Sequence, residues 1–473
     1  LLYGSPGTGK TTFLQSAAMD LARKFSPKDI TLYLMDFGTN GLAPLGQLPQ
    51  VADTLLLDQT EKIAKFVRIM ERELNRRKKL LSDYGVGTLE LYRQASGQQE
   101  PAIVILLDSY ESMKEEAYEA ELFRLLVRIS REGLSIGVHL LVTAGRQSNL
   151  RAQFYANFKH QLSLPQNDFG EVRSIVGSTP LAKMMEDIKG RALMKRDEVD
   201  VIQLALPVAG ANDAQVLNNL RQEVASLQEA WTGQRPSAIP MVPEELSKEV
   251  FYQAYGIQEL LQQEVIPMGL DMENVQPVGW QTHQGPFVYV AGEKEEQKLA
   301  ITEHIIEMSK QMDKKVVLLA PLYNMLPEMD DEVLTAFDKE ALEETILSIS
   351  AKLDERMANR QFDYVATVLF YDFSDFIEEL SIDTQKELAR ILEKGPKLGY
   401  MPIVITDVSL TKHYDTATKV VRNFKQGLIA TRINDQQVLN VNNRPNTREP
   451  VLEVQEHYLV QDNMARKVKV FIE

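Results

Sequence analysis

The sequence predicts an α/β protein of two tandem domains, each built on a mostly parallel sheet flanked by helices. Three observations predict this fold class. A strand, a glycine-rich loop and a helix follow one another at residues 1–25, short apolar runs then alternate with helical stretches, and the second half repeats the order of the first. The 473 residues also exceed one ordinary core, because a domain holds about 150 residues.

The first element is the apolar strand "LLY" at residues 1–3, and the helix at 13–25 follows the loop with apolar residues at helical spacing. The chain has no initiator Met and starts inside this buried strand. We therefore expect a fragment that lacks the amino-terminal part of the first domain. A membrane anchor in the parent chain is compatible with this expectation.

The loop between them, "GSPGTGKTT", matches G-x-x-x-x-G-K-[ST] in full at Gly4, Gly9, Lys10 and Thr11. Glycines allow backbone N–H groups to surround a polyphosphate, while the lysine reaches the β- and γ-phosphates and the threonine hydroxyl ligates Mg²⁺. The motif predicts a P-loop NTPase with ATP and Mg²⁺ as cofactors. The expected nucleotide-binding residues are Gly4, Ser5, Pro6, Gly7, Thr8, Gly9, Lys10, Thr11 and Thr12.

A second acidic element is expected on a neighbouring strand, and the apolar run at 102–108 ends in Asp108. We predict Lys10 and Asp108 as catalytic residues, with Thr11 and Asp108 serving the Mg²⁺. Ser109 stands where many such ATPases carry a glutamate that polarises the attacking water. Glu111 could replace that glutamate only if the turn brings it back toward the water.

Further strands are expected at 31–37, 53–58 and 137–145, with a long helix at 60–85. Ligands of such sheets bind at the carboxyl ends of the strands. Arg146, just after the last of these strands, is a candidate for sensing the γ-phosphate or an ordinary surface arginine. The "RRKK" run at 76–79 lies in a glutamate-rich helix and is interpreted as a solvated face rather than a nucleic-acid site.

A proline-bearing polar stretch separates the halves, so we expect domains at 1–235 and 251–473 joined by a linker at 236–250. Overlaying the halves places Gly292 on Gly4, Lys298 on Lys10 and Asp372 on Asp108. Thr406 falls on Thr143, and the segment 426–443 falls on 190–207. The two halves are interpreted as copies of one domain.

The second copy lacks what phosphate binding requires. Gln297 replaces the last glycine of the loop, Leu299 offers no oxygen to Mg²⁺, and glutamates at 293, 295 and 296 would repel a triphosphate. We expect a retained fold and an abandoned site, with Gly292, Lys298 and Asp372 as its remnants.

These residues resemble the FtsK/SpoIIIE-type ring ATPases, and in particular the tandem carboxy-terminal ATPase domains of the EssC/EccC motors of type VII secretion. The resemblance rests on "GSPGTGKTT", "LYLMDFGTNGLAPL", "RRKKLLSDYGVGTLELY", "GRALMKRDEVDVIQLALP" and "IPMGLD". It covers nearly the whole chain, and the degenerate last repeat is also similar.

The resemblance implies the cytoplasmic part of a membrane-anchored bacterial protein, here its second and third ATPase domains. Family members form hexameric rings, work with other secretion-system subunits and export WXG100 (ESX-type) proteins. Arg146 or Arg191 would contact nucleotide across a subunit boundary, although Arg191 is also explained as a turn arginine. Ser109 implies slow or assembly-dependent turnover, and the second domain would dock substrate or a neighbouring subunit.

Two other functions stay open. One is a double-stranded DNA translocase. The net charge of −15 and the unequal repeats argue against it. The other is a nucleotide-gated assembly module without useful hydrolysis. The sequence has no cysteine, which excludes disulfides and thiolate metal sites and fits the cytoplasm.

Overall fold

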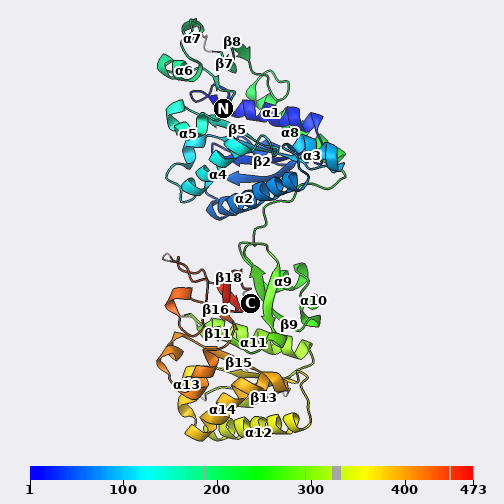
Figure 1. Ribbon diagram of the computed structural model, residues 1–473, viewed down its shortest axis with the longest axis vertical. Helices are drawn as coiled ribbons and strands as arrows, with labels where there is room; N and C mark the ends of the chain where they lie inside the picture. The colour runs from blue at the N-terminus through cyan, green and yellow to red at the C-terminus, as the bar shows by residue number, and fades with distance from the viewer. Residues whose placement is uncertain (185–187, 293–294, 322–331, 447–448, 472–473) are drawn as a thin grey trace. The chain divides into compact units, whose positions relative to one another are not determined.

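The computed structural model describes residues 1–184, 188–292, 295–321, 332–446 and 449–471. The chain divides into two compact units, Leu1–Ile239 and Pro240–Glu473. In each unit helices cover a central sheet (Figure 1). This is the α/β architecture that the alternation of strands and helices predicts.

The first unit contains a sheet in the order β3-β2-β4-β5-β1-β6-β7-β8. Neighbouring strands are parallel from β3 to β6, and only β7 and β8 are antiparallel to their neighbours. The strands are β1 Leu2–Tyr3, β2 Ile30–Asp36, β3 Val51–Leu56, β4 Ala102–Asp108, β5 Val138–Ala144, β6 Leu162–Ser163, β7 Arg191–Lys195 and β8 Val199–Gln203.

Helices lie on both faces of this sheet. Leu14 and Ala18 of α1 pack with Leu32 of β2 in one core cluster, whereas Tyr33, on the opposite face, meets Phe66 of α2 with ring centroids 5.1 Å apart. Burial on both faces explains why the strands are almost continuously apolar. The helices are α1 Lys10–Lys24, α2 Thr60–Asp83, α3 Leu89–Ser96, α4 Glu119–Glu132, α5 Ala152–Tyr155, α6 Phe169–Val176, α7 Leu181–Met184 and α8 Asp213–Ala230.

The carboxyl ends of β1, β2, β4 and β5 meet at the glycine loop. Asp36 pairs in register with Asp108, and Tyr3, at the end of β1, pairs with Ala144 at the end of β5. The parallel sheet therefore places residues distant in sequence around the start of α1, as expected for ligand sites in such folds.

The second unit repeats this arrangement in a sheet of order β10-β9-β18-β17-β16-β11-β15-β14-β12-β13. The strands from β16 to β13 are parallel, and the other four are antiparallel. The strands are β9 Val265–Asp271, β10 Pro277–Gln281, β11 Phe287–Val290, β12 Lys315–Leu319, β13 Val333–Ala336, β14 Ala366–Phe370, β15 Tyr400–Thr406, β16 Gln426–Ile429, β17 Glu456–Gln461 and β18 Met464–Lys469. The prediction of two mostly parallel sheets flanked by helices is confirmed.

Helices of the second unit also cover both faces of its sheet, since α12 and α14 contribute to one core cluster and α11 to another. They are α9 Lys248–Ala254, α10 Ile257–Gln262, α11 Glu295–Gln311, α12 Lys339–Ala358, α13 Phe373–Glu379, α14 Ile382–Lys394 and α15 Thr416–Val421. Within the described ranges, no helix of either unit has the length and apolar content of a membrane span.

One part of the repeat overlay is wrong. The segment 426–443 was expected to match 190–207, but its strand β16 lies parallel to β11 just as β6 lies parallel to β1. The antiparallel pair β17 and β18 takes the place of β7 and β8. Short apolar segments with similar turn residues look alike in sequence, and only strand pairing distinguishes them.

Candidate functional site

The glycine loop connects β1 to α1, and backbone hydrogen bonds hold its first residues. Its first amide, Gly4 N–H, donates to the carbonyl of Ala144 at 3.2 Å, and Ser5 N–H donates to the carbonyl of Pro165 at 3.1 Å. Gly7 and Gly9 have φ values of 77° and 111°, a region that residues with a Cβ rarely adopt. This conformation leaves the first N–H groups of α1 without helical partners at the end where anions bind.

The Lys10 side chain bends back over the loop. Its Nζ donates to the carbonyls of Gly4 at 2.8 Å and Ser5 at 3.2 Å. Burial lowers the pKa of Lys10, and the nearby carboxylates of Glu111 and Asp108 oppose this shift. A charged amine that is held only by carbonyl oxygens is available to exchange them for phosphate oxygens.

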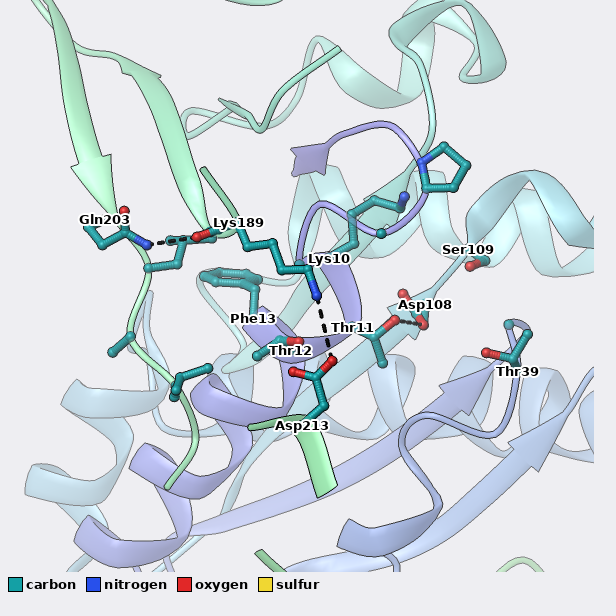
Figure 2. A pocket seen from close by; sticks show the side chains of 18 of the residues that line it. Lys10, Thr11, Thr12, Phe13, Thr39, Asp108, Ser109, Lys189, Gln203 and Asp213 are labelled. Carbon is teal, nitrogen blue, oxygen red and sulfur yellow. Dashed lines mark hydrogen bonds and ion pairs between the residues drawn. The ribbon is translucent and has the colours of Figure 1, made fainter. Parts of the chain in front are cut away.

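Asp108 lies at the end of β4 and is held by two hydroxyls. Thr11 Oγ1 donates to Oδ2 at 2.7 Å, and Thr143 Oγ1 donates to Oδ1 at 2.5 Å (Figure 2 shows the bond from Thr11). Thr143 in turn accepts the Ser109 amide at 2.9 Å. The hydroxyl of Thr11 and the carboxylate of Asp108 are hard oxygen donors, as a Mg²⁺ ion requires.

A second buried carboxyl group, Asp36, ends the neighbouring strand β2. Its Oδ2 accepts the Leu42 amide at 2.7 Å, while Oδ1 accepts no hydrogen bond from the described residues. Burial raises the pKa of Asp36, and the charge of Asp108 adds to the shift. Asp36 was not predicted as a site residue, although its place at the end of an apolar strand beside Asp108 could have indicated it.

The turn after β4 brings Glu111 to the loop. Ser109 adopts a left-handed conformation with φ 59°, and a short 3-10 helix, η2 Tyr110–Met113, follows it. The Oε1 atom of Glu111 accepts the Gly145 amide at 3.0 Å. The turn thus places Glu111 at the cavity, and its role as a replacement for the acidic residue missing at Ser109 stays a prediction.

Lys10, Thr11, Asp108 and Glu111 line a cavity of ≈ 760 Å³, a size typical of small-molecule and cofactor sites. Figure 2 shows Lys10 and Thr11 at one side and Phe13 and Gln203 at the other. Six of the predicted loop residues line it, namely Pro6, Gly7, Gly9, Lys10, Thr11 and Thr12. Thr8 is instead buried, with its hydroxyl bonded to the carbonyl of Ser5 at 2.8 Å.

The side of the cavity away from Asp108 was not predicted. It is lined by Phe13, Gln203 and Leu204, and an exposed ion pair joins Lys189 to Asp213 at 3.5 Å across it (Figure 2). Gln203 and Leu204 lie in the segment 190–207 that carries part of the resemblance, but no phosphate-binding or acidic motif marks them, and β8 joins the sheet through the pairing of β6, β7 and β8.

The two arginine candidates differ in their surroundings. Arg146 follows β5 directly and is exposed, while Arg191 is half-buried at the first position of β7. Neither residue lines the cavity. Their suggested contact with nucleotide therefore stays a prediction.

The corresponding place in the second unit is closed by an ion pair. Lys298 Nζ lies 2.7 Å from Asp372 Oδ1, and both residues are buried. Leu299 occupies the position of Thr11 and supplies no hydroxyl to the Asp372 carboxylate, which pairs with the lysine instead. Gly292 precedes them, and a Cβ there would lie 2.9 Å from the carbonyl oxygen of Ala430. Glu293 and the side chain of Glu295 lie outside the described residues, and Glu296 is exposed.

Comparison with known proteins extends these observations. Residues 1–194 match the model of the FtsK/SpoIIIE family. The chain is 29% identical over 482 residues to the type VII secretion system protein EssC of Staphylococcus aureus (strain MSSA476), covering 99% of this chain and 32% of that protein. It is also 29% identical over 455 residues to the ESX secretion system protein EccC of Geobacillus thermodenitrificans (strain NG80-2), covering 92% of this chain and 30% of that protein.

Among solved structures, EssC (ATPases 2 and 3) from Geobacillus thermodenitrificans superposes with a TM-score of 0.89 at 28% identity, covering 99% of this chain and 90% of that one. The chain spans about a third of the length of the full relatives it matches. The resemblance expected from the local motifs is confirmed over nearly the whole chain, and these comparisons support a P-loop ATPase.

Proposed function

We propose that this chain, a homologue of the EssC/EccC type VII secretion ATPases, is the cytoplasmic motor segment of a protein-export system. The first unit binds and hydrolyses Mg-ATP. The second unit holds no nucleotide and serves substrate recognition or assembly. The observation that carries this proposal is the contrast between the open loop above Asp108 and the ion pair that closes its counterpart at Asp372.

In the first unit the chain's own groups meet each demand of a triphosphate. The loop amides and the amino end of α1 surround the phosphates, and Lys10 moves from the carbonyls of Gly4 and Ser5 to phosphate oxygens. Thr11 and Asp108 would hold Mg²⁺, which neutralises charge on the β- and γ-phosphates when bound. Thr143 keeps the Asp108 carboxylate turned toward Thr11.

In the second unit the same demands are not met. Lys298 is engaged by Asp372, and binding a phosphate would require separating two buried charges. The expected role of this unit is the docking of a WXG100 (ESX-type) substrate or a neighbouring subunit. Both docking roles are proposed from homology. The hexameric ring, the other secretion-system subunits and a membrane anchor elsewhere in the parent protein are proposed on the same ground.

The basic run at 76–79 gives no support to a DNA translocase. Arg76 and Arg77 are paired with Glu73, each at 2.7 Å, and also with Glu100, while Lys78 lies 2.5 Å from Glu132. Arg77 is itself buried. Charges that are neutralised within the protein contribute little to binding a phosphate backbone.

Calorimetric titration with Mg-ATP tests the assignment of the two units. We expect a single nucleotide per chain in the wild type, none in Lys10→Ala, and an unchanged single site in Lys298→Ala. At an ATP concentration about 100 times Kd, binding should stabilise the first unit by about 2.7 kcal/mol and leave the second unchanged. A nucleotide retained by Lys10→Ala but lost in Lys298→Ala would overturn the proposal.

Phosphate release, measured in the same samples over a range of protein concentrations, separates a motor from a nucleotide-gated assembly module. Turnover above the Lys10→Ala background, rising as rings form, supports the motor. Binding without turnover at every concentration supports the module instead.

A further inference from the structure

The turn that follows β4 is rigidly held, and this fixes the position of Glu111. Tyr110 is buried and stacks on Phe154, with ring centroids 5.5 Å apart and an interplanar angle of 19°. Met113 is also buried, and the amide of Ser112 bonds to the carbonyl of Ser109 at 3.0 Å. Apolar anchors on both sides of Glu111 leave its side chain to face the cavity, which it lines.

The two oxygens of Glu111 differ. Oε1 accepts the Gly145 amide at 3.0 Å, which fixes the plane of the carboxylate at the end of β5. Oε2 is buried and accepts no hydrogen bond from the described residues. A buried carboxylate oxygen without a donor is costly to maintain, and such a group at a cavity wall calls for a functional explanation.

We propose that Glu111 is the general base of ATP hydrolysis in the first unit, an inference that rests on the function proposed above. As the water oxygen bonds to the γ-phosphorus, Oε2 of Glu111 takes the proton of that water. The bond from the γ-phosphorus to the bridging oxygen breaks, and its electron pair leaves on the β-phosphate of ADP. Inorganic phosphate and ADP depart, and Glu111 returns the proton to solvent.

The other buried carboxyl group near the site is less suited to this role. Asp36 does not line the cavity, and its Oδ2 already accepts the Leu42 amide. Asp108 is engaged by Thr11 and Thr143. Glu111 therefore combines a place on the cavity wall with a carboxylate oxygen that accepts no hydrogen bond from the described residues.

The test is Glu111→Gln in the 473-residue chain. The glutamine carbonyl oxygen can still accept the Gly145 amide, so the turn should keep its shape, but the amide cannot take a proton. We expect phosphate release to fall by about 10²-fold or more, while ATP affinity measured by calorimetry changes by less than about twofold. Glu115→Gln, an exposed acid just beyond the same turn, is the matched control and should keep wild-type turnover.

Two results would overturn the inference. If Glu111→Gln releases phosphate at the wild-type rate, Glu111 only supports Gly145, and the proposed motor stands without it. If the wild type binds ATP but its phosphate release never exceeds that of Lys10→Ala at any protein concentration, the base and the hydrolytic part of the proposed function both fail.

Discussion

Lys10 and Lys298 occupy matching places in the two repeats but have different partners. Lys10 is held by two backbone carbonyls, whereas Lys298 forms a buried ion pair with Asp372. Separating a buried pair by removing one partner leaves an uncompensated charge, which is strongly unfavourable. A residue typical of phosphate binding has thus become part of the internal structure in the second unit.

This difference predicts unequal effects on stability. Lys298→Ala should lower the free energy of unfolding of the second unit by about 3–5 kcal/mol, because Asp372 is left buried without its cation. Urea unfolding followed by Trp280 fluorescence in a Trp231→Phe background measures it, since Trp280 is fully buried in that unit. Lys352→Ala, an exposed lysine of α12, is the control. Equal losses in the two variants would show that the ion pair contributes nothing.

At the scale of elements, the site depends on how a loop and a sheet edge are joined. The loop is positioned by β1, whose neighbour β5 supplies the Ala144 carbonyl that holds Gly4, while Pro165, just after β6, supplies the carbonyl that holds Ser5. The positive φ values of Gly7 and Gly9 then lead the chain into α1, whose first N–H groups have no helical partners. Loop geometry and strand pairing together produce the proposed phosphate site, and neither is sufficient alone.

Gly9→Ala tests the loop conformation. A Cβ at Gly9 would make only an ordinary contact with Gly190, at 3.5 Å, so the penalty arises from its φ of 111°. Holding a left-handed conformation without glycine costs about 1–2 kcal/mol. A loop that relaxes to avoid this cost no longer holds its backbone N–H groups in the arrangement that surrounds the phosphates. We expect ATP affinity to fall about tenfold or more by calorimetry. Gly85→Ala, with φ 64° after α2 and no atom near its Cβ, should lower stability without changing affinity.

A comparable loss of affinity in Gly85→Ala would mean that general destabilisation, rather than the loop, explains the effect. Unchanged affinity in Gly9→Ala would show that the loop amides tolerate another conformation.

At the scale of the whole molecule, the two units carry separate cores and different titratable groups. The second unit buries His304 against Tyr252 and the carbonyl of Pro267, and His457 against Tyr289. Burial lowers the pKa of each histidine from 6.5 to about 4. The unfolded chain therefore binds protons between these values that the folded unit does not, and acid favours unfolding.

The second unit should accordingly be most stable above pH 6.5 and lose stability as the pH falls toward about 4. One pKa unit corresponds to about 1.4 kcal/mol, so each histidine should remove about 2 kcal/mol at about pH 5. Trp280 fluorescence in urea at several pH values measures the slope. His304→Gln and His457→Gln should each reduce it, and an unchanged slope in both would assign the acid sensitivity to other groups.

The amino-acid sequence alone determined the features that depend on local pattern. The loop at Gly4–Thr12, the strand ending in Asp108 and the alternation of strands with helices follow from residue types at short spacing, and they sufficed to predict the fold class and the EssC/EccC homology. Gln297 and Leu299 likewise predict a second phosphate site without its chemistry, and this stays a prediction.

Tertiary structure decided the features that depend on contacts between distant segments. Short sequence patterns do not specify strand pairing, and three features arise from it. It brings Lys298 to Asp372, places Asp36 beside Asp108 and forms the antiparallel hairpin β17–β18. Glu111 is the clearest case. Its spacing from Asp108 allowed the side chain to lie toward the site or away from it, and the turn anchored by the buried Tyr110 places it at the cavity. Side-chain direction after a strand is set by packing, and packing exists only once the sheet has formed.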